Sequence, residues 1–207
     1  MKKEISSFTK GISKKPEYPE QFKTVVRELS SNDYVQSLNI KNVEQILDLN
    51  LPSVKHISDI FGEAQVLILT YNKFEKYLDM AEFELTEPQI SIIVERTIMR
   101  YPYFNFGDID LMLRKGISGE LGKIYDKVRI DTILGQGGWL EIYSNWQHRN
   151  KRDVIDKVIN EYFESKGKDP IAAMNHYITE GIKKGIGHLH TRYSIYRKIK
   201  NTIKDAL

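Results

Sequence analysis

Histidines and closely spaced carboxylates are the side chains in this sequence whose chemistry could be catalytic or metal-binding. His188 and His190 are two residues apart, and Asp108 and Asp110 share that spacing. Side chains two apart on a helix point to different sides, and no HExxH motif or acidic cluster accompanies the histidines. We interpret Asp108 as an acidic first-turn residue that interacts favourably with a helix dipole. The sequence therefore predicts no catalytic residue, no metal site and no cofactor, because acid–base chemistry needs groups that converge on one pocket.

Two glycine-rich segments invite a phosphate-binding interpretation. Residues 135–138 are followed by Trp139 rather than by the lysine and hydroxyl residue of a Walker A loop, so we predict a helix kink or break there, which could serve as a hinge. Residues 116–125 carry three glycines, whose backbone amides can approach a phosphate. The alternative is a tight connection between two helices, with Tyr125 filling the core. The predicted phosphate-contacting residues are Arg114, Lys115, Gly119, Gly122 and Lys123.

The C-terminal segment carries a surplus of basic residues interleaved with tyrosines. Residues 151–207 hold twelve Lys/Arg and seven Asp/Glu, and residues 181–204 hold seven basic and no acidic residues. Isoleucines recur every four residues from Ile195, so one helix face can pack on the body while lysines reach phosphates and tyrosines stack on unpaired bases. The alternative is a solvated, lysine-rich helix end. The predicted nucleic-acid-binding residues are Arg149, Lys151, Arg152, Lys183, Lys184, Arg192, Tyr193, Tyr196, Arg197, Lys198, Lys200 and Lys204.

Composition places the chain among globular proteins, with 41% hydrophobic and 29% charged residues in a length of 207. The absence of cysteine excludes disulfides, thiolate metal sites and a cysteine nucleophile. The N-terminus lacks the apolar stretch of a signal peptide, which favours a cytoplasmic location. The longest apolar run, Val66–Leu69, is too short to span a bilayer, and the C-terminal helix lacks the Trp or Phe of a membrane-surface helix. We therefore expect no membrane partner.

Helical periodicity and capping signals predict an all-α multi-helix bundle. Asn42 and Ser53 are suited to begin helices, and Thr86-Glu87-Pro88-Gln89 is a capping-box start. A buried strand at Gln65–Tyr71 competes with a central helix at Glu63–Met80, because short apolar runs are ambiguous. The predicted helices are 20–29, 34–38, 43–49, 54–61, 63–80, 87–100, 106–114, 125–150, 151–165, 171–184 and 190–204. The predicted core residues are Ile93, Val94, Ile98, Leu113, Trp139, Ile142 and Trp146.

Three regions follow from this organisation. Residues 1–16 are polar and rich in lysine and serine, so we predict a flexible N-terminal arm. Residues 17–165 form the predicted helical core domain. Residues 166–207 form a basic two-helix C-terminal extension, which begins at the linker-like break 166–170.

Several short motifs within residues 85–149 share a recognisable pattern. They are Tyr101-Pro102-Tyr103, Asp108-Ile109, the turn from Gly119 to Tyr125, and the helix from Trp139 to Tyr143. This third of the chain resembles a small helical family found in proteins of phages and mobile elements of Bacteroidetes. Proteins of this type look like accessory factors of replication, similar to helicase loaders. The resemblance implies no catalytic residues, and the segment 136–138 departs from the family pattern.

These observations favour a nucleic-acid-associated accessory protein of phage or mobile-element replication, which binds DNA or a helicase through a basic helical surface. The alternative is a protein–protein adaptor or a phage structural component, in which the basic segment docks an acidic subunit. An enzyme is a third hypothesis and would need a convergent polar pocket, which the sequence does not indicate.

Overall fold

The computed structural model describes residues 24, 27–122, 128–183 and 188–205, and of residues 180–183 and 188–191 it describes the backbone alone. Within these ranges the protein is all-α, as predicted, with no strand. The predicted arm at 1–16 and most of the predicted helix at 20–29 lie outside the described residues. The helices are α2 Asn32–Ser37, α3 Val43–Leu49, α4 Val54–Phe61, α5 Glu63–Met80, α6 Glu87–Arg100, α7 Phe106–Ile117, α8 Ile130–Leu134, α9 Trp139–Ser165, α10 Pro170–Lys183 and α11 His188–Lys204.

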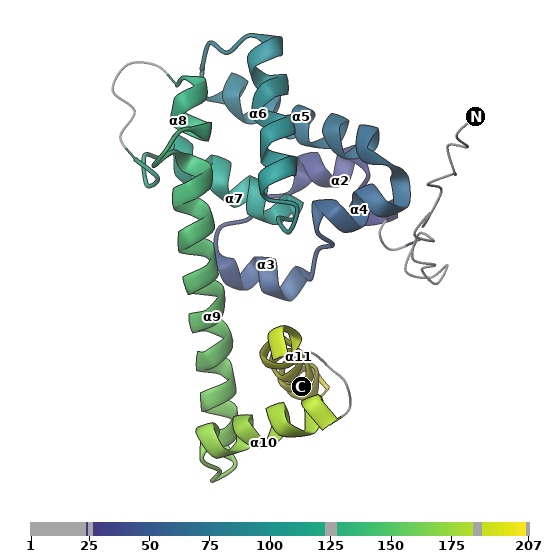
Figure 1. The fold of residues 1–207 in the computed structure, drawn as a ribbon, viewed down its shortest axis with the longest axis vertical. Helices are drawn as coiled ribbons and strands as arrows, with labels where there is room; N and C mark the ends of the chain where they lie inside the picture. The colour runs from purple at the N-terminus through teal and green to yellow at the C-terminus, as the bar shows by residue number, and fades with distance from the viewer. Residues whose placement is uncertain (1–23, 25–26, 123–127, 184–187, 206–207) are drawn as a thin grey trace, which may run out of the picture.

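The long helix α9 joins two parts of the molecule (Figure 1). Helices α2 to α8 form a body around the N-terminal half of α9. Helices α10 and α11 pack against its C-terminal half, and α11 returns to lie beside α3. No described helix is long and apolar enough to cross a membrane.

The predicted capping residues begin their helices, because each satisfies a backbone amide that has no partner within the helix. The Asn42 side chain accepts a hydrogen bond from the Gln45 amide, and Ser53 accepts one from the His56 amide. The Thr86 amide donates to Oε1 of Gln89 at 2.8 Å, as a capping box requires.

Residues 63–80 form one helix, and the alternative strand at 65–71 is wrong. The buried positions of α5 recur at helical spacing through Val66, Leu69, Lys73, Phe74 and Tyr77. A strand would bury every second residue instead. The helical period extends well past residue 71, so the whole apolar stretch belongs to α5.

The predicted helix at 125–150 is interrupted at its predicted weak point, because residues 135–138 separate α8 from α9. Gly135 and Gly138 are extended, and Gly137 has a φ of 69°, which glycine adopts without steric cost. The chain therefore restarts at Trp139, and α9 runs without interruption through the two stretches predicted as 139–150 and 151–165. Helix α7 also extends three residues beyond the predicted end at Arg114.

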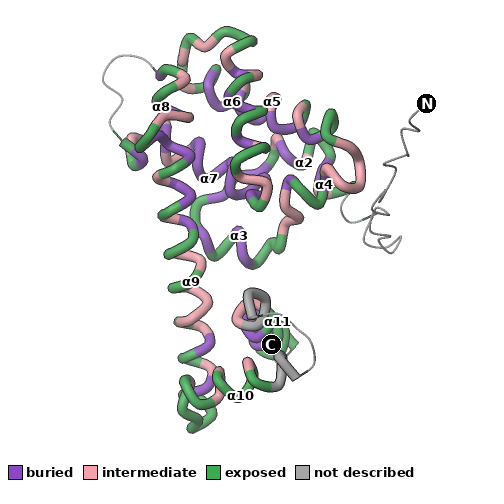
Figure 2. The backbone as a smooth tube through the Cα atoms, in the orientation of Figure 1, coloured by how far each residue is buried: buried purple, intermediate pink, exposed green. Residues whose placement is uncertain are grey.

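The body is packed around one apolar cluster, and all seven predicted core residues belong to it, four buried and three partly buried. Trp139 lies directly against Gly116, where any β-carbon would overlap the indole ring. This contact fixes the start of α9 on the end of α7. A second, smaller cluster holds α10 and α11 to the far half of α9, where few residues are buried (Figure 2). Its buried members are Ile159, Phe163, Ile195 and Ile199.

Candidate functional site

Helix α11 docks on the molecule through the apolar face that its isoleucine spacing predicted. Ile195 and Ile199 are buried against α9. Tyr196 is 2% exposed, and its hydroxyl donates to Oδ1 of Asp48 at 3.1 Å. The Tyr193 hydroxyl donates to Oδ1 of Asn50 at 2.8 Å. The two tyrosines predicted to stack on bases therefore anchor α11 to α3 and the residue that follows it, and the Tyr196 ring is not available to a base.

Several cations predicted to contact phosphates are held by carboxylates within the chain. Arg192 Nη1 lies 3.0 and 2.9 Å from the two oxygens of Asp156, which also pairs with Arg152 at 3.6 Å. Lys200 Nζ lies 3.2 Å from Asp48. Lys151 Nζ lies 2.9 Å from the buried Asp108. These contacts position helices, so the surplus of charge counted from the sequence overstates the charge available to a partner.

The remaining predicted cations are exposed. They are Arg149, Arg197, Lys198 and Lys204, and none of them forms an ion pair with another described residue. Lys198 Nζ lies 5.6 Å from the centroid of the Tyr177 ring. The side chains of Lys183 and Lys184 lie outside the described residues.

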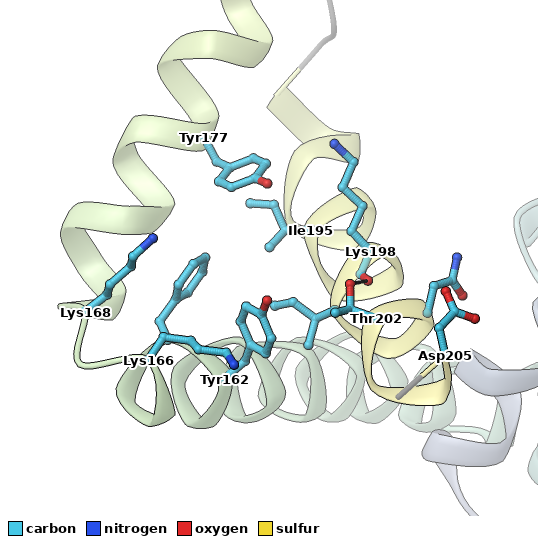
Figure 3. A pocket seen from close by; sticks show the side chains of 11 residues that line it. Tyr162, Lys166, Lys168, Tyr177, Ile195, Lys198, Thr202 and Asp205 are labelled. Carbon is cyan, nitrogen blue, oxygen red and sulfur yellow. Dashed lines mark hydrogen bonds between the residues drawn. The ribbon is translucent and has the colours of Figure 1, made fainter. Parts of the chain in front are cut away.

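A cleft of about 690 Å³ lies between α9, α10 and α11 and brings basic and aromatic side chains together (Figure 3). Lys166 and Lys168 come from the turn that joins α9 to α10, and Lys198 comes from α11. Tyr162 and Tyr177 come from α9 and α10. The remaining lining residues are Phe163, Ile195, Ile199, Asn201, Thr202 and Asp205.

The cleft combines an apolar floor with a basic rim. Phe163, Ile195 and Ile199 are buried, whereas the three lysines are exposed and form no ion pair with a described residue. Asp205 is the only carboxylate among the lining residues, so the lining carries a formal surplus of positive charge. The arrangement can hold a flat apolar group on the floor and an anionic group at the rim.

Most of this cleft was not predicted from the sequence. Lys166 and Lys168 lie in the linker-like break predicted at 166–170, and Tyr162 and Tyr177 lie in the predicted helices 151–165 and 171–184 without being among the predicted binding residues. Lys198 alone was among the predicted residues. The signal that could have identified the cleft is Gly167 in the tight turn after α9, where its φ of 65° redirects the chain into α10, which runs across the end of α9 (Figure 1).

The described cations of the predicted phosphate-contacting turn form ion pairs with carboxylates of the same chain. Arg114 Nε donates to Oδ2 of Asp110 at 3.1 Å. Lys115 pairs with Glu120 and lies 4.6 Å from the centroid of the Trp146 ring. The hydrogen bond from Lys115 lowers the pKa of Glu120. Glu120 is thus the counterion of Lys115 within this connection between helices, in the place where a phosphate was predicted to bind.

Gly119 and Gly122 have φ values of 81° and 126°, which suit a tight turn. Lys123 and Tyr125 lie outside the described residues.

Asp108 lies in the first turn of α7, as predicted, and both acidic residues of this helix are buried, which the sequence did not predict. Asp108 does cap the first turn, since Oδ2 accepts from the Asn105 amide. It is also fully buried and accepts hydrogen bonds from Tyr143, Gln147 and Lys151, all on α9. The sequence spacing could not show this, because the donors lie 35 to 43 residues away.

Asp110 is the centre of a second buried network. Lys73 Nζ lies 2.5 Å from Oδ1, and the Tyr77 hydroxyl donates to the same oxygen at 2.7 Å. The Ile40 amide donates to Oδ2 at 2.8 Å. Burial lowers the pKa of Lys73, an effect that the Asp110 carboxylate opposes. Because each carboxylate oxygen is already occupied, this network is suited to hold α5 and α7 together rather than to perform chemistry.

Among the described residues, no group of three or more His, Asp or Glu side chains is placed to hold a metal ion. The side chains of His188 and His190 lie outside the described residues. Comparison of the chain with protein-family models, with curated proteins and with solved structures found no match.

Proposed function

We propose that this protein is a non-catalytic nucleic-acid-binding protein and that its binding surface is the cleft between α9, α10 and α11. The observation that carries the proposal is the group of three exposed lysines, Lys166, Lys168 and Lys198, which surround an apolar floor without an ion-pair partner among the described residues. Lysines that meet phosphates release condensed counterions, and this release supplies most of the affinity of such surfaces.

Other exposed cations of the predicted set lie outside this surface. Arg197 and Lys204 lie on α11, and Arg149 lies near the middle of α9, but none of the three lines the cleft, so we assign them no contact in it. By contrast, the cations that hold α11 in place already have carboxylate partners, as Lys200 has with Asp48. The proposed surface is therefore narrower than the twelve-residue set predicted from the sequence.

The cellular role that we propose is accessory to replication of a phage or mobile element, in the cytoplasm of a bacterial host, with DNA or a helicase as the partner. It rests on the resemblance within residues 85–149 alone. The cleft supports nucleic-acid binding independently of that resemblance, since it lies wholly outside those residues.

Binding of fluorescently labelled oligonucleotides, followed by anisotropy at low salt, tests the proposal. The test variant Lys166→Glu/Lys168→Glu/Lys198→Glu reverses the rim of the cleft. The matched control Lys55→Glu/Arg96→Glu/Arg129→Glu changes net charge equally at exposed positions of the body. We expect the test variant to lose binding and the control to keep it. An equal loss of oligonucleotide affinity in both variants would mean that binding depends on net charge and not on the cleft.

A second candidate function, a protein–protein adaptor, is favoured by one apolar groove on the body. A hollow of about 280 Å³ lies between α5 and α6 and is lined by Leu67, Tyr71, Val94 and Ile68, of which Ile68 is 56% exposed. An Ile68→Lys variant that lost a protein partner while keeping oligonucleotide affinity would support this function.

A further inference from the structure

The walls of the cleft pair each tyrosine with a lysine. Lys198 Nζ lies 5.6 Å from the centroid of the Tyr177 ring, and Lys166 Nζ lies 5.9 Å from the centroid of the Tyr162 ring. The two pairs come from different sides of the cleft, since Tyr162 and Lys166 belong to the end of α9 while Tyr177 and Lys198 face each other from α10 and α11 (Figure 3). An aromatic face beside an ammonium matches the chemistry of a nucleotide, which carries a flat base beside a phosphate.

The Tyr177 ring is accessible for such contact. It is 38% exposed, and its hydroxyl has no hydrogen-bond partner among the described residues. Figure 3 shows the ring directed into the cleft above Ile195, so a base that lay on the ring would also meet the apolar floor. Tyr193 and Tyr196 differ in this respect, because their hydroxyls are bonded to the body.

The dimensions of the cleft favour unpaired nucleotides over a duplex. A volume of about 690 Å³ is in the range of sites for small molecules, which is roughly 300–1,000 Å³. In a duplex the base faces are stacked on one another, and a protein reads the edges through the grooves. In a single strand every base presents a face on which an aromatic side chain can stack.

We propose that the cleft binds a short stretch of single-stranded nucleic acid, with one base stacked on Tyr177 and the adjoining phosphates at Lys166, Lys168 and Lys198. This inference rests on the proposed function and adds to it the strand preference and the stacking residue. Asp205, which directly follows α11, is the only carboxylate of the lining, and it disfavours a phosphate at that end of the cleft.

The test compares a labelled single strand with a duplex of the same sequence, using the full chain and the variants Tyr177→Ala and Tyr177→Phe. Because stacking contributes roughly 1–3 kcal/mol per base, Tyr177→Ala should weaken single-strand binding about 5- to 150-fold. Tyr177→Phe keeps the ring and should bind within about twofold of the unaltered protein. Duplex binding should not depend on residue 177.

A single strand that contains 2-aminopurine gives a second measurement, because the fluorescence of this base is quenched when it stacks. We expect quenching with the unaltered protein and with Tyr177→Phe, and none with Tyr177→Ala. Circular dichroism and thermal unfolding of each variant check that α10 remains folded, which the exposed position of the ring leads us to expect.

The outcomes separate this inference from the proposed function. Equal binding of strand and duplex, with no effect of Tyr177→Ala, would overturn the single-strand inference and leave nucleic-acid binding in place. Absence of binding to either oligonucleotide at low salt would overturn both. Binding of a labelled polyglutamate peptide in the same assay, with no oligonucleotide binding, would assign the cleft to an acidic protein segment instead.

Discussion

The buried networks of the body and the C-terminal cleft differ in whether their cations form ion pairs with carboxylates. In the body, Lys73, Arg114 and Lys151 are bound to the buried carboxylates Asp108 and Asp110. Around the cleft, lysines stand exposed, and none pairs with a carboxylate among the described residues. The two regions contain similar side chains, but the carboxylates of α7 bind cations from α5 and α9, whereas the cleft has only Asp205.

This difference shows that a count of basic residues does not measure the charge available to a partner. Lys200 and Lys198 are two residues apart on the same helix, yet one pairs with Asp48 and the other lies on the cleft. Within α11, we therefore expect the cations that lack a carboxylate partner to contribute more to binding than the paired ones.

The largest predicted effect comes from leaving a buried cation unpaired. The variant Asp110→Ala removes the partner of Lys73, whose side chain is fully buried. We expect the free energy of unfolding to fall by about 3–5 kcal/mol in urea titrations, because an uncompensated charge stays in the core. Lys198→Ala, at an exposed position, should change it by less than about 0.5 kcal/mol.

A paired replacement sharpens this prediction. Lys73→Met/Asp110→Leu removes both charges. Its free energy of unfolding should be higher than that of Asp110→Ala. If the double variant were as unstable as the single one, the loss would come from the hydrogen bonds of Tyr77 and Ile40 to Asp110 rather than from the unpaired lysine.

Alkaline pH should destabilise the body through its buried tyrosines. Burial raises the pKa of Tyr143, and Asp108 adds to this effect. Burial also raises the pKa of Tyr77. Above the ordinary value of 10.0, the unfolded chain releases protons that the folded chain retains. The contribution of each tyrosine to stability is therefore full below pH 10 and declines above it, by at most about 1.4 kcal/mol per pH unit.

The lowered pKa of Lys73 changes stability with pH in the opposite direction. The unfolded chain holds this proton more tightly, so this contribution to stability increases as the pH rises toward the ordinary value of 10.5. Urea unfolding across this range should give a stability that declines once the pH exceeds 10. Tyr143→Phe should flatten the decline, and an unchanged slope in that variant would contradict the role assigned to Tyr143.

A smaller effect is expected where α11 meets the body. Tyr196→Phe removes the hydrogen bond to Asp48 while keeping the ring in the core. We expect a loss of about 1 kcal/mol in the free energy of unfolding, which is typical of one hydrogen bond, because the acceptor Asp48 is exposed and its charge is screened by solvent. Tyr177→Phe serves as the matched control, because its hydroxyl has no partner among the described residues, and it should leave stability unchanged.

The finest comparison uses two neighbouring lysines of α11. Lys198→Ala should weaken oligonucleotide binding severalfold at low salt, because it removes a phosphate contact. Lys200→Ala removes a lysine that is already paired with Asp48, so its effect on binding should be smaller. Anisotropy titrations at one salt concentration distinguish the two variants, and an equal effect would mean that pairing does not decide which cations bind.

Local signals were enough to predict much of the fold. Capping residues such as Asn42 and Ser53 act within one helical turn, and the helical period of buried residues in α5 is visible without tertiary information. The residue at which α9 begins was not predicted, because the sequence left open whether residues 135–138 bend or break the helix. Its start is set by the contact of Trp139 with Gly116, which lies on another helix.

The candidate site depended on tertiary contacts and was mostly missed. Lys73 and Lys151 were indistinguishable from free cations in the sequence, because their partners Asp110 and Asp108 lie far away along the chain. The same reason explains why Tyr193 and Tyr196 were interpreted as base-stacking residues, although they bind Asn50 and Asp48. The cleft is formed by three helices, since the turn at Gly167 directs α10 across the end of α9 and α11 completes the lining.

The salt dependence of single-strand binding tests the account most directly. Affinity is measured over a range of salt concentrations for the unaltered protein, for Lys166→Glu/Lys168→Glu/Lys198→Glu, and for the control Lys55→Glu/Arg96→Glu/Arg129→Glu. We expect the cleft variant to lose affinity. The slope of the logarithm of its binding constant against the logarithm of salt concentration should become shallower by about 2, at roughly 0.7 per phosphate contact removed. An unchanged slope and affinity in the cleft variant would contradict the claim that these three lysines meet phosphates.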